Sequence, residues 1–77
     1  MKSTDYYRLV SQRPDRAFIE QAWIERVLRN PEYRMTQSDG RIRCWGRVPE
    51  HGNRYLRVVL LPDGETVHNA FFDRGIR

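Results

Sequence analysis

Residues 41–48, RIRCWGRV, alternate strictly between two kinds of side chain. One side carries Arg41, Arg43, Trp45 and Arg47, and the other carries Ile42, Cys44, Gly46 and Val48. A period of two residues is typical of a β-strand that has one buried face. We therefore expect a half-buried strand here, with the arginines on its outer side.

Two further strands are predicted downstream, each preceded by a turn. Residues 49–53 form the first turn, and residues 54–61 are so rich in Val and Leu that they predict a central strand. Pro62, Asp63 and Gly64 turn the chain into a third strand at residues 65–72. These segments predict an antiparallel β-meander.

The segment before residue 41 predicts one main helix. Apolar residues recur every four positions at Ile19, Trp23 and Val27, which indicates an amphipathic helix over residues 15–30 that ends before Pro31. Residues 33–36 are expected to extend, and residues 6–10 to form an edge strand. The expected fold is α+β: a three- to four-stranded meander with this N-terminal helix on one face, in a single domain over residues 1–77.

The two turns fix which side chains share a face of the predicted sheet. We expect Val48 opposite Arg54, Leu60 opposite Val67, Val59 opposite His68 and Leu56 opposite Phe71. The apolar face then comprises Ile42, Leu56, Val58, Leu60, Val67 and Phe71, covered by the helix residues Trp23, Val27 and Leu28. The opposite face comprises Arg43, Trp45, Arg47, Tyr55, Arg57 and His68.

The chain is basic, with a net charge of +4 and a pI of about 9.8. Lys2 is the one lysine among 14 basic residues, and arginine is the side chain that grips phosphate or carboxylate with two hydrogen bonds. The segment from Tyr33 to Arg57 contains six arginines and two acidic residues, so the excess of positive charge lies in this part of the chain. It favours an anionic partner, although an arginine-rich, GC-rich genome is an equal alternative.

The cysteine content and the hydropathy indicate a cytoplasmic setting. Cys44 is the single cysteine, so no internal disulfide is expected. The longest aliphatic run is residues 58–61, which is too short to enter a membrane. Two histidines and one cysteine do not favour a metal site, and no cofactor motif is present, so we expect no cofactor.

Two stretches resemble an uncharacterised family of small bacterial domains. They are GRIRCWGRVPEHGNRYLRVVLLPDGETVHNAFFDR, residues 40–74, and WIERVLRNPE, residues 23–32. That family is similar to the BrnT and RelE toxins, metal-independent ribonucleases in which helices cover one sheet face and RNA binds the other. Its members commonly carry a histidine on a helix after the first strand, whereas this chain has none before His51.

These features predict a protein that binds RNA. The catalytic version of this prediction is a metal-independent endoribonuclease of the toxin type. The catalytic candidates are Arg57 and Arg74, which would stabilise a phosphate, and His68, which would exchange protons. The RNA-binding candidates are Arg43, Trp45, Arg47 and Tyr55. The alternative is that these residues simply form a solvated outer face.

A protein-interaction module without catalysis is the alternative from another class. Exposed aromatics beside arginines are also typical of protein interfaces, so Trp45 and Tyr55 fit a protein partner as well as a base. The expected partner is then an acidic, antitoxin-like protein or a second copy of the chain, bound at this face or at an edge strand. His51 is expected to be a surface residue of the turn.

Overall fold

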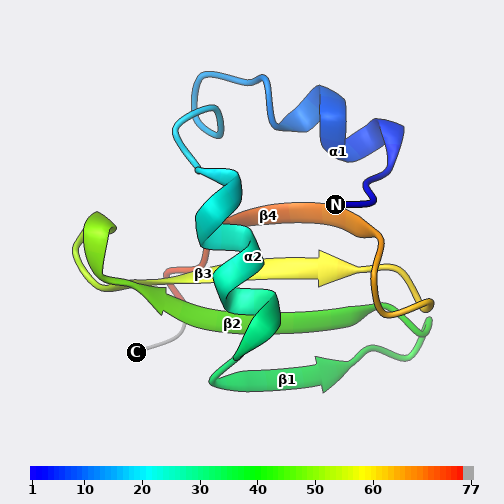
Figure 1. The fold of residues 1–77 in the computed structure, drawn as a ribbon. Helices are drawn as coiled ribbons and strands as arrows, with labels where there is room; N and C mark the ends of the chain where they lie inside the picture. The colour runs from blue at the N-terminus through cyan, green and yellow to red at the C-terminus, as the bar shows by residue number, and fades with distance from the viewer. Residues whose placement is uncertain (76–77) are drawn as a thin grey trace.

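Four antiparallel strands form one sheet in the computed structural model, which describes residues 1–75 (Figure 1). They are adjacent in chain order: β1 (Tyr33–Thr36), β2 (Ile42–Val48), β3 (Arg54–Leu60) and β4 (Val67–Phe72). The predicted α+β fold class and the meander are confirmed, with residues 33–36 as the fourth strand. The turn after β2 contains the short 3-10 helix η1 (Pro49–His51), followed by Gly52 and Asn53 with positive φ.

The register between β2 and β3 is the predicted one. Val48 pairs with Arg54 and Trp45 pairs with Arg57. Ile42, Cys44, Val48, Leu56 and Val58 are buried on the face that packs against the helix. Gly46 makes close packing possible there, because a Cβ at this position would lie 3.1 Å from a methyl group of Val27.

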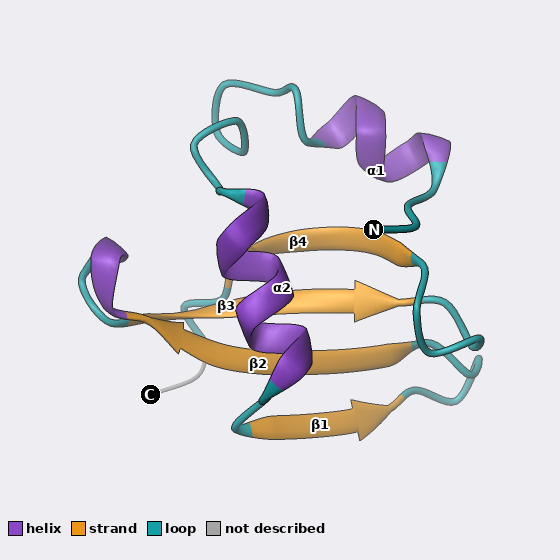
Figure 2. Cartoon of the chain, viewed as in Figure 1, coloured by secondary structure: helices purple, strands orange, loops and turns teal. Residues whose placement is uncertain are grey.

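Helix α2 (Gln21–Arg29) lies across the apolar face of the sheet (Figure 2). It buries Trp23, Ile24 and Val27 and ends before Pro31, as predicted. Its predicted start at residue 15 is wrong, because residues 14–18 form turns instead. The Arg16 side chain contributes to this difference: it reaches β4, where it donates to the Asn69 side chain (3.0 Å) and the Ala70 carbonyl (3.3 Å).

The N-terminal segment forms a helix rather than the predicted edge strand at residues 6–10. Helix α1 (Asp5–Val10) starts at Thr4, whose hydroxyl accepts the Tyr7 N–H, and Asp5 pairs with Arg8 one turn later. Before the helix, Ser3 forms a parallel bridge with Val67, so residues 2–4 cover the edge of β4.

The hairpin between β3 and β4 contains one extra residue. Leu60 opposes Val67 as predicted, but the register then shifts, so that Asn69 and not His68 opposes Val59. Leu56 in turn opposes Phe72 and not Phe71, and Phe72 packs against the core. Val67 bonds through both its N–H and its C=O to the N-terminal segment, which holds β4 in this bulged register. The predicted core position of Phe71 is therefore wrong.

Candidate nucleic-acid interface

The sheet face opposite α2 carries most of the predicted site residues, and we call it the arginine face. Pairing and alternation place these side chains on it: Tyr33, Met35, Arg43, Trp45, Arg47, Tyr55, Arg57, Val59, Asn69 and Phe71. Residues of this face contribute to the lining of two hollows, and Phe71 lines both of them.

Trp45 and Tyr55 lie on the arginine face, but both are only 7% exposed. Trp45 Nε1 donates to Asp73 Oδ2 at 3.0 Å, and the Arg47 guanidinium lies 5.3 Å from the Tyr55 ring centroid. Neither ring offers the open flat surface that base stacking needs. Tyr33, which is 53% exposed, offers it instead, and the sequence signal for it was the predicted extension of residues 33–36.

The guanidinium of Arg57 is largely buried but has few polar contacts that would compensate for the loss of water. Its Nε is the one buried side-chain nitrogen or oxygen of residues 1–75 without a hydrogen-bond partner, and its Nη1 lies 3.6 Å from Asp73. Its Cζ lies 4.2 Å from the centroid of the Phe71 ring. Burial lowers the pKa of Arg57, Asp73 opposes that shift, and Arg43 adds to it. An anion beside this side chain would replace the hydration that it has lost.

A small hollow of about 320 Å³ opens next to Arg57. Its lining consists of Tyr6, Gln37, Arg41, Arg43, Arg57, Val59, His68, Asn69 and Phe71. No acidic side chain is among these described residues, although two acids lie just outside the lining, Asp39 at 3.7 Å from Arg41 and Asp73 at 3.6 Å from Arg57. Gln37 holds Arg43 in place by accepting from its Nε at 2.9 Å. The small hollow thus gathers three guanidinium groups and suits an anion the size of phosphate.

His68 lies in the β4 bulge at the border of the small hollow. Its Nδ1 is 3.1 Å from the Thr4 hydroxyl, and its ring stacks on Tyr6 with centroids 4.9 Å apart. The bulge and the first turn of α1 therefore position the imidazole together. His68 reaches the small hollow by this route and not through the predicted pairing with Val59.

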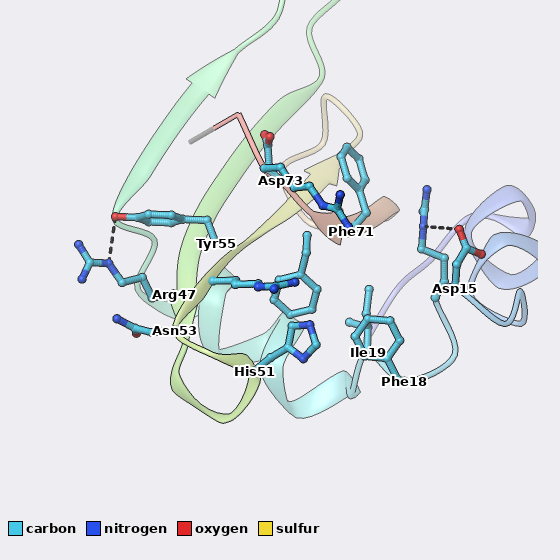
Figure 3. A pocket seen from close by; sticks show the side chains of 13 residues that line it. Asp15, Phe18, Ile19, Arg47, His51, Asn53, Tyr55, Phe71 and Asp73 are labelled. Atoms are coloured by element: carbon cyan, nitrogen blue, oxygen red, sulfur yellow. Dashed lines mark hydrogen bonds and ion pairs between the residues drawn. The ribbon is translucent and has the colours of Figure 1, made fainter. Parts of the chain in front are cut away.

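A large hollow of about 1110 Å³ lies where the turn before α2, the turn after β2 and the C-terminal end of β4 meet (Figure 3). One wall consists of aromatic rings and one aliphatic side chain, from Phe18, Ile19, His51, Phe71 and Phe72. The polar lining consists of Asp15, Arg16, Arg47, Asn53, Arg54, Tyr55, Asp73 and Arg74. Four arginines against two aspartates give this hollow a positive balance as well.

His51 was expected to be a surface residue of the turn, but its ring packs against the aromatic side chains of this wall. Its ring centroid lies 4.3 Å from that of Phe72, 5.0 Å from Phe18 and 6.2 Å from Trp23. The sequence did not identify Phe18, Arg54 or Phe72 as site residues, and it placed His51 on the surface of the turn. No local signal identifies them, because the contacts join segments far apart in the chain.

The predicted site residues are divided between the two hollows. Arg43, Arg57 and His68 line the small hollow, while Arg47, Tyr55 and Arg74 line the large one. Trp45 lines neither. The predicted catalytic set of Arg57, His68 and Arg74 is therefore not gathered in one concavity.

Comparison with protein-family models, with curated proteins and with solved structures found no match for the chain. The resemblance to the relatives of BrnT and RelE therefore stays a prediction. Within residues 1–75, no group of three or more acidic, histidine or cysteine side chains could hold a metal ion. No helix within residues 1–75 is long and apolar enough to cross a membrane.

Proposed function

We propose that this chain binds single-stranded RNA through the arginine face, with a backbone phosphate in the small hollow. The observation that carries the proposal is the convergence of Arg41, Arg43 and Arg57 on one hollow without an acidic lining residue. Guanidinium groups bind phosphate oxygens with paired, charge-assisted hydrogen bonds. The exposed ring of Tyr33 on the same face supports a single strand, whose bases are free to stack.

The choice of RNA over DNA follows from the resemblance to the BrnT and RelE toxins. Cleavage is the narrower form of the proposal, because Arg57 and His68 both line the small hollow and would both meet a phosphodiester placed there. Arg74 lines the other hollow, so binding is better supported than catalysis. Incubating labelled RNA with the protein and a metal chelator separates the two, since intact RNA at high protein concentration excludes the nuclease.

The test of binding is a fluorescence titration of labelled single-stranded RNA. Arg41→Gln/Arg43→Gln removes two guanidinium groups of the small hollow and should weaken binding by roughly tenfold or more. The logarithm of the binding constant should also fall with the logarithm of the salt concentration, by about 0.7 for each phosphate contacted. The double variant should show a shallower slope.

A charge-matched control is available on the rest of the molecule. Arg13→Gln/Arg29→Gln also removes two exposed arginines, which line neither hollow and form no ion pair within residues 1–75. It should change the affinity by less than about threefold at physiological salt, because exposed charges are screened. Equal losses in the two double variants would reduce the effect to net charge and contradict the proposed site.

Strand addition at β1 is the second candidate function. All four residues of this edge strand are exposed, including Tyr33 and Met35, and an edge strand carries unpaired backbone groups. The partner would be a second copy of the chain. Sedimentation at micromolar concentration separates this candidate from RNA binding, since it requires a dimer that a charge at position 35, in Met35→Lys, abolishes.

A further inference from the structure

The large hollow has features that phosphate binding in the small hollow does not use. Its wall is a set of flat rings from three separate segments, seen together in Figure 3. Phe18 and Phe72 stack with 8° between their planes and 5.9 Å between centroids, and His51 lies against both. Such a wall is a surface on which a further ring can stack.

Phe18 leaves part of this wall open to solvent. It is 45% exposed, although it is one of the largest apolar side chains in the chain. Its segment is anchored beside β4 by the hydrogen bonds of Arg16, whose Cζ also lies 5.1 Å from the Phe71 ring centroid. The open ring is therefore held in a fixed place, and an exposed apolar ring at the mouth of a hollow is typical of a binding site.

The rim of the large hollow keeps unneutralised positive charge. Arg54 and Arg74 are exposed and form no ion pair within residues 1–75. Each of the two acids of the lining already lies near an arginine other than these two, since Asp15 is 3.9 Å from Arg16 and Asp73 is 3.6 Å from Arg57. Rings on the wall and cations on the rim together match a ligand with a flat ring and an anionic group.

We propose that the large hollow takes one unpaired nucleobase of the bound strand, stacked on Phe18, with the adjoining phosphate held by Arg54 and Arg74. This rests on the proposed function and adds a base-binding subsite to it. Phe71 lines both hollows, so a strand with a phosphate in the small hollow continues to the large one over a shared surface. The volume of about 1110 Å³ is sufficient for a nucleotide.

Affinity for a base is tested with two strands of equal charge. One is a single-stranded RNA of roughly eight nucleotides, a length typical of such sites, and the other is the same backbone with every base removed. Phe18→Ala should bind the base-containing strand at least about fivefold more weakly than the unaltered protein does. It should bind the baseless strand almost as tightly as the unaltered protein. Leu9→Ala, which removes another exposed apolar side chain outside both hollows, should leave both affinities unchanged.

A photocrosslink on the unaltered protein gives a result that does not depend on how a variant folds. An RNA that contains 5-iodouridine should crosslink to Phe18, His51 or Phe72, located by mass spectrometry of the digested complex. Crosslinks confined to other residues, or equal affinities of Phe18→Ala and Leu9→Ala, would overturn the base-binding proposal and leave phosphate binding standing. Failure of the intact RNA to bind would overturn both.

Discussion

Arg57 lines the small hollow, and its guanidinium is incompletely hydrogen-bonded within the protein. Its side chain is 23% exposed, its Nε is without a partner, and Asp73 is at 3.6 Å, beyond the range of a hydrogen bond. A buried, incompletely paired charge stabilises a fold little, and an apolar side chain of similar length often does as well. The arrangement is better explained by a bound anion than by stability.

Replacing Arg57 with methionine should therefore separate stability from binding. Arg57→Met keeps an unbranched chain over the Phe71 ring, and Asp73 keeps its hydrogen bonds from Trp45 and Gly75, so the free energy of unfolding should change by less than about 1 kcal/mol. RNA affinity should fall by roughly tenfold, because one phosphate ligand is lost. Urea denaturation and the RNA titration measure the two effects.

The opposite pattern would assign Arg57 a structural role. A stability loss of more than about 2 kcal/mol with unchanged RNA affinity would show that its contact with Asp73 supports the fold. Arg43→Met serves as the comparison, since Arg43 lines the same hollow and is held by Gln37 rather than by a carboxylate.

Part of the candidate site could be predicted residue by residue. Arg43, Arg47 and Arg57 follow from the period of two and from one hairpin register, both local in the sequence. The burial of Trp45 could not be predicted, because it involves long-range contacts such as the hydrogen bond to Asp73, which lies 28 positions away in the chain. The same limit applies to the contact between Phe18 and His51.

At the scale of elements, the meander was predictable because each strand and turn carries its own signal. The bulge in β4 was not, since the backbone bonds beside it join Val67 to residues 2–4 at the other end of the chain. The sequence does contain a local signal for the start of helix α1, but the aromatic residues within residues 6–10 favoured a strand prediction instead. Thr4 followed by Asp5 is a typical helix start, and it prevails over a β-prone composition.

The Thr4 hydroxyl connects α1 to the β4 bulge, so its removal should affect both elements. Thr4→Ala leaves the Tyr7 N–H without its cap and His68 without its neighbour, and should lower the free energy of unfolding by about 1 kcal/mol. Thr4→Ser keeps the hydroxyl and should retain most of that stability. Urea denaturation of the two variants provides the measurement, and equal losses would attribute the effect to the methyl group.

At the scale of the whole molecule, the distribution of charge matters more than its sum. The molecule measures 31 × 26 × 21 Å, whereas charges are screened over about 8 Å at physiological ionic strength. A partner on the arginine face is therefore influenced mainly by the arginines of β2 and β3. The same face carries rings, so the molecule offers a strand two interactions with different dependence on salt.

Single-stranded and double-stranded RNA of the same sequence should separate these two interactions. Both carry phosphates for the small hollow, but only the single strand has bases that can leave their stack to contact Tyr33 or enter the large hollow. The single strand should bind roughly tenfold more tightly at low salt, and the ratio should grow at higher salt, since stacking is less sensitive to salt than phosphate contacts. Titrations of both RNAs over a salt series measure the ratio, and a preference for the duplex would show that the arginine face binds backbone alone.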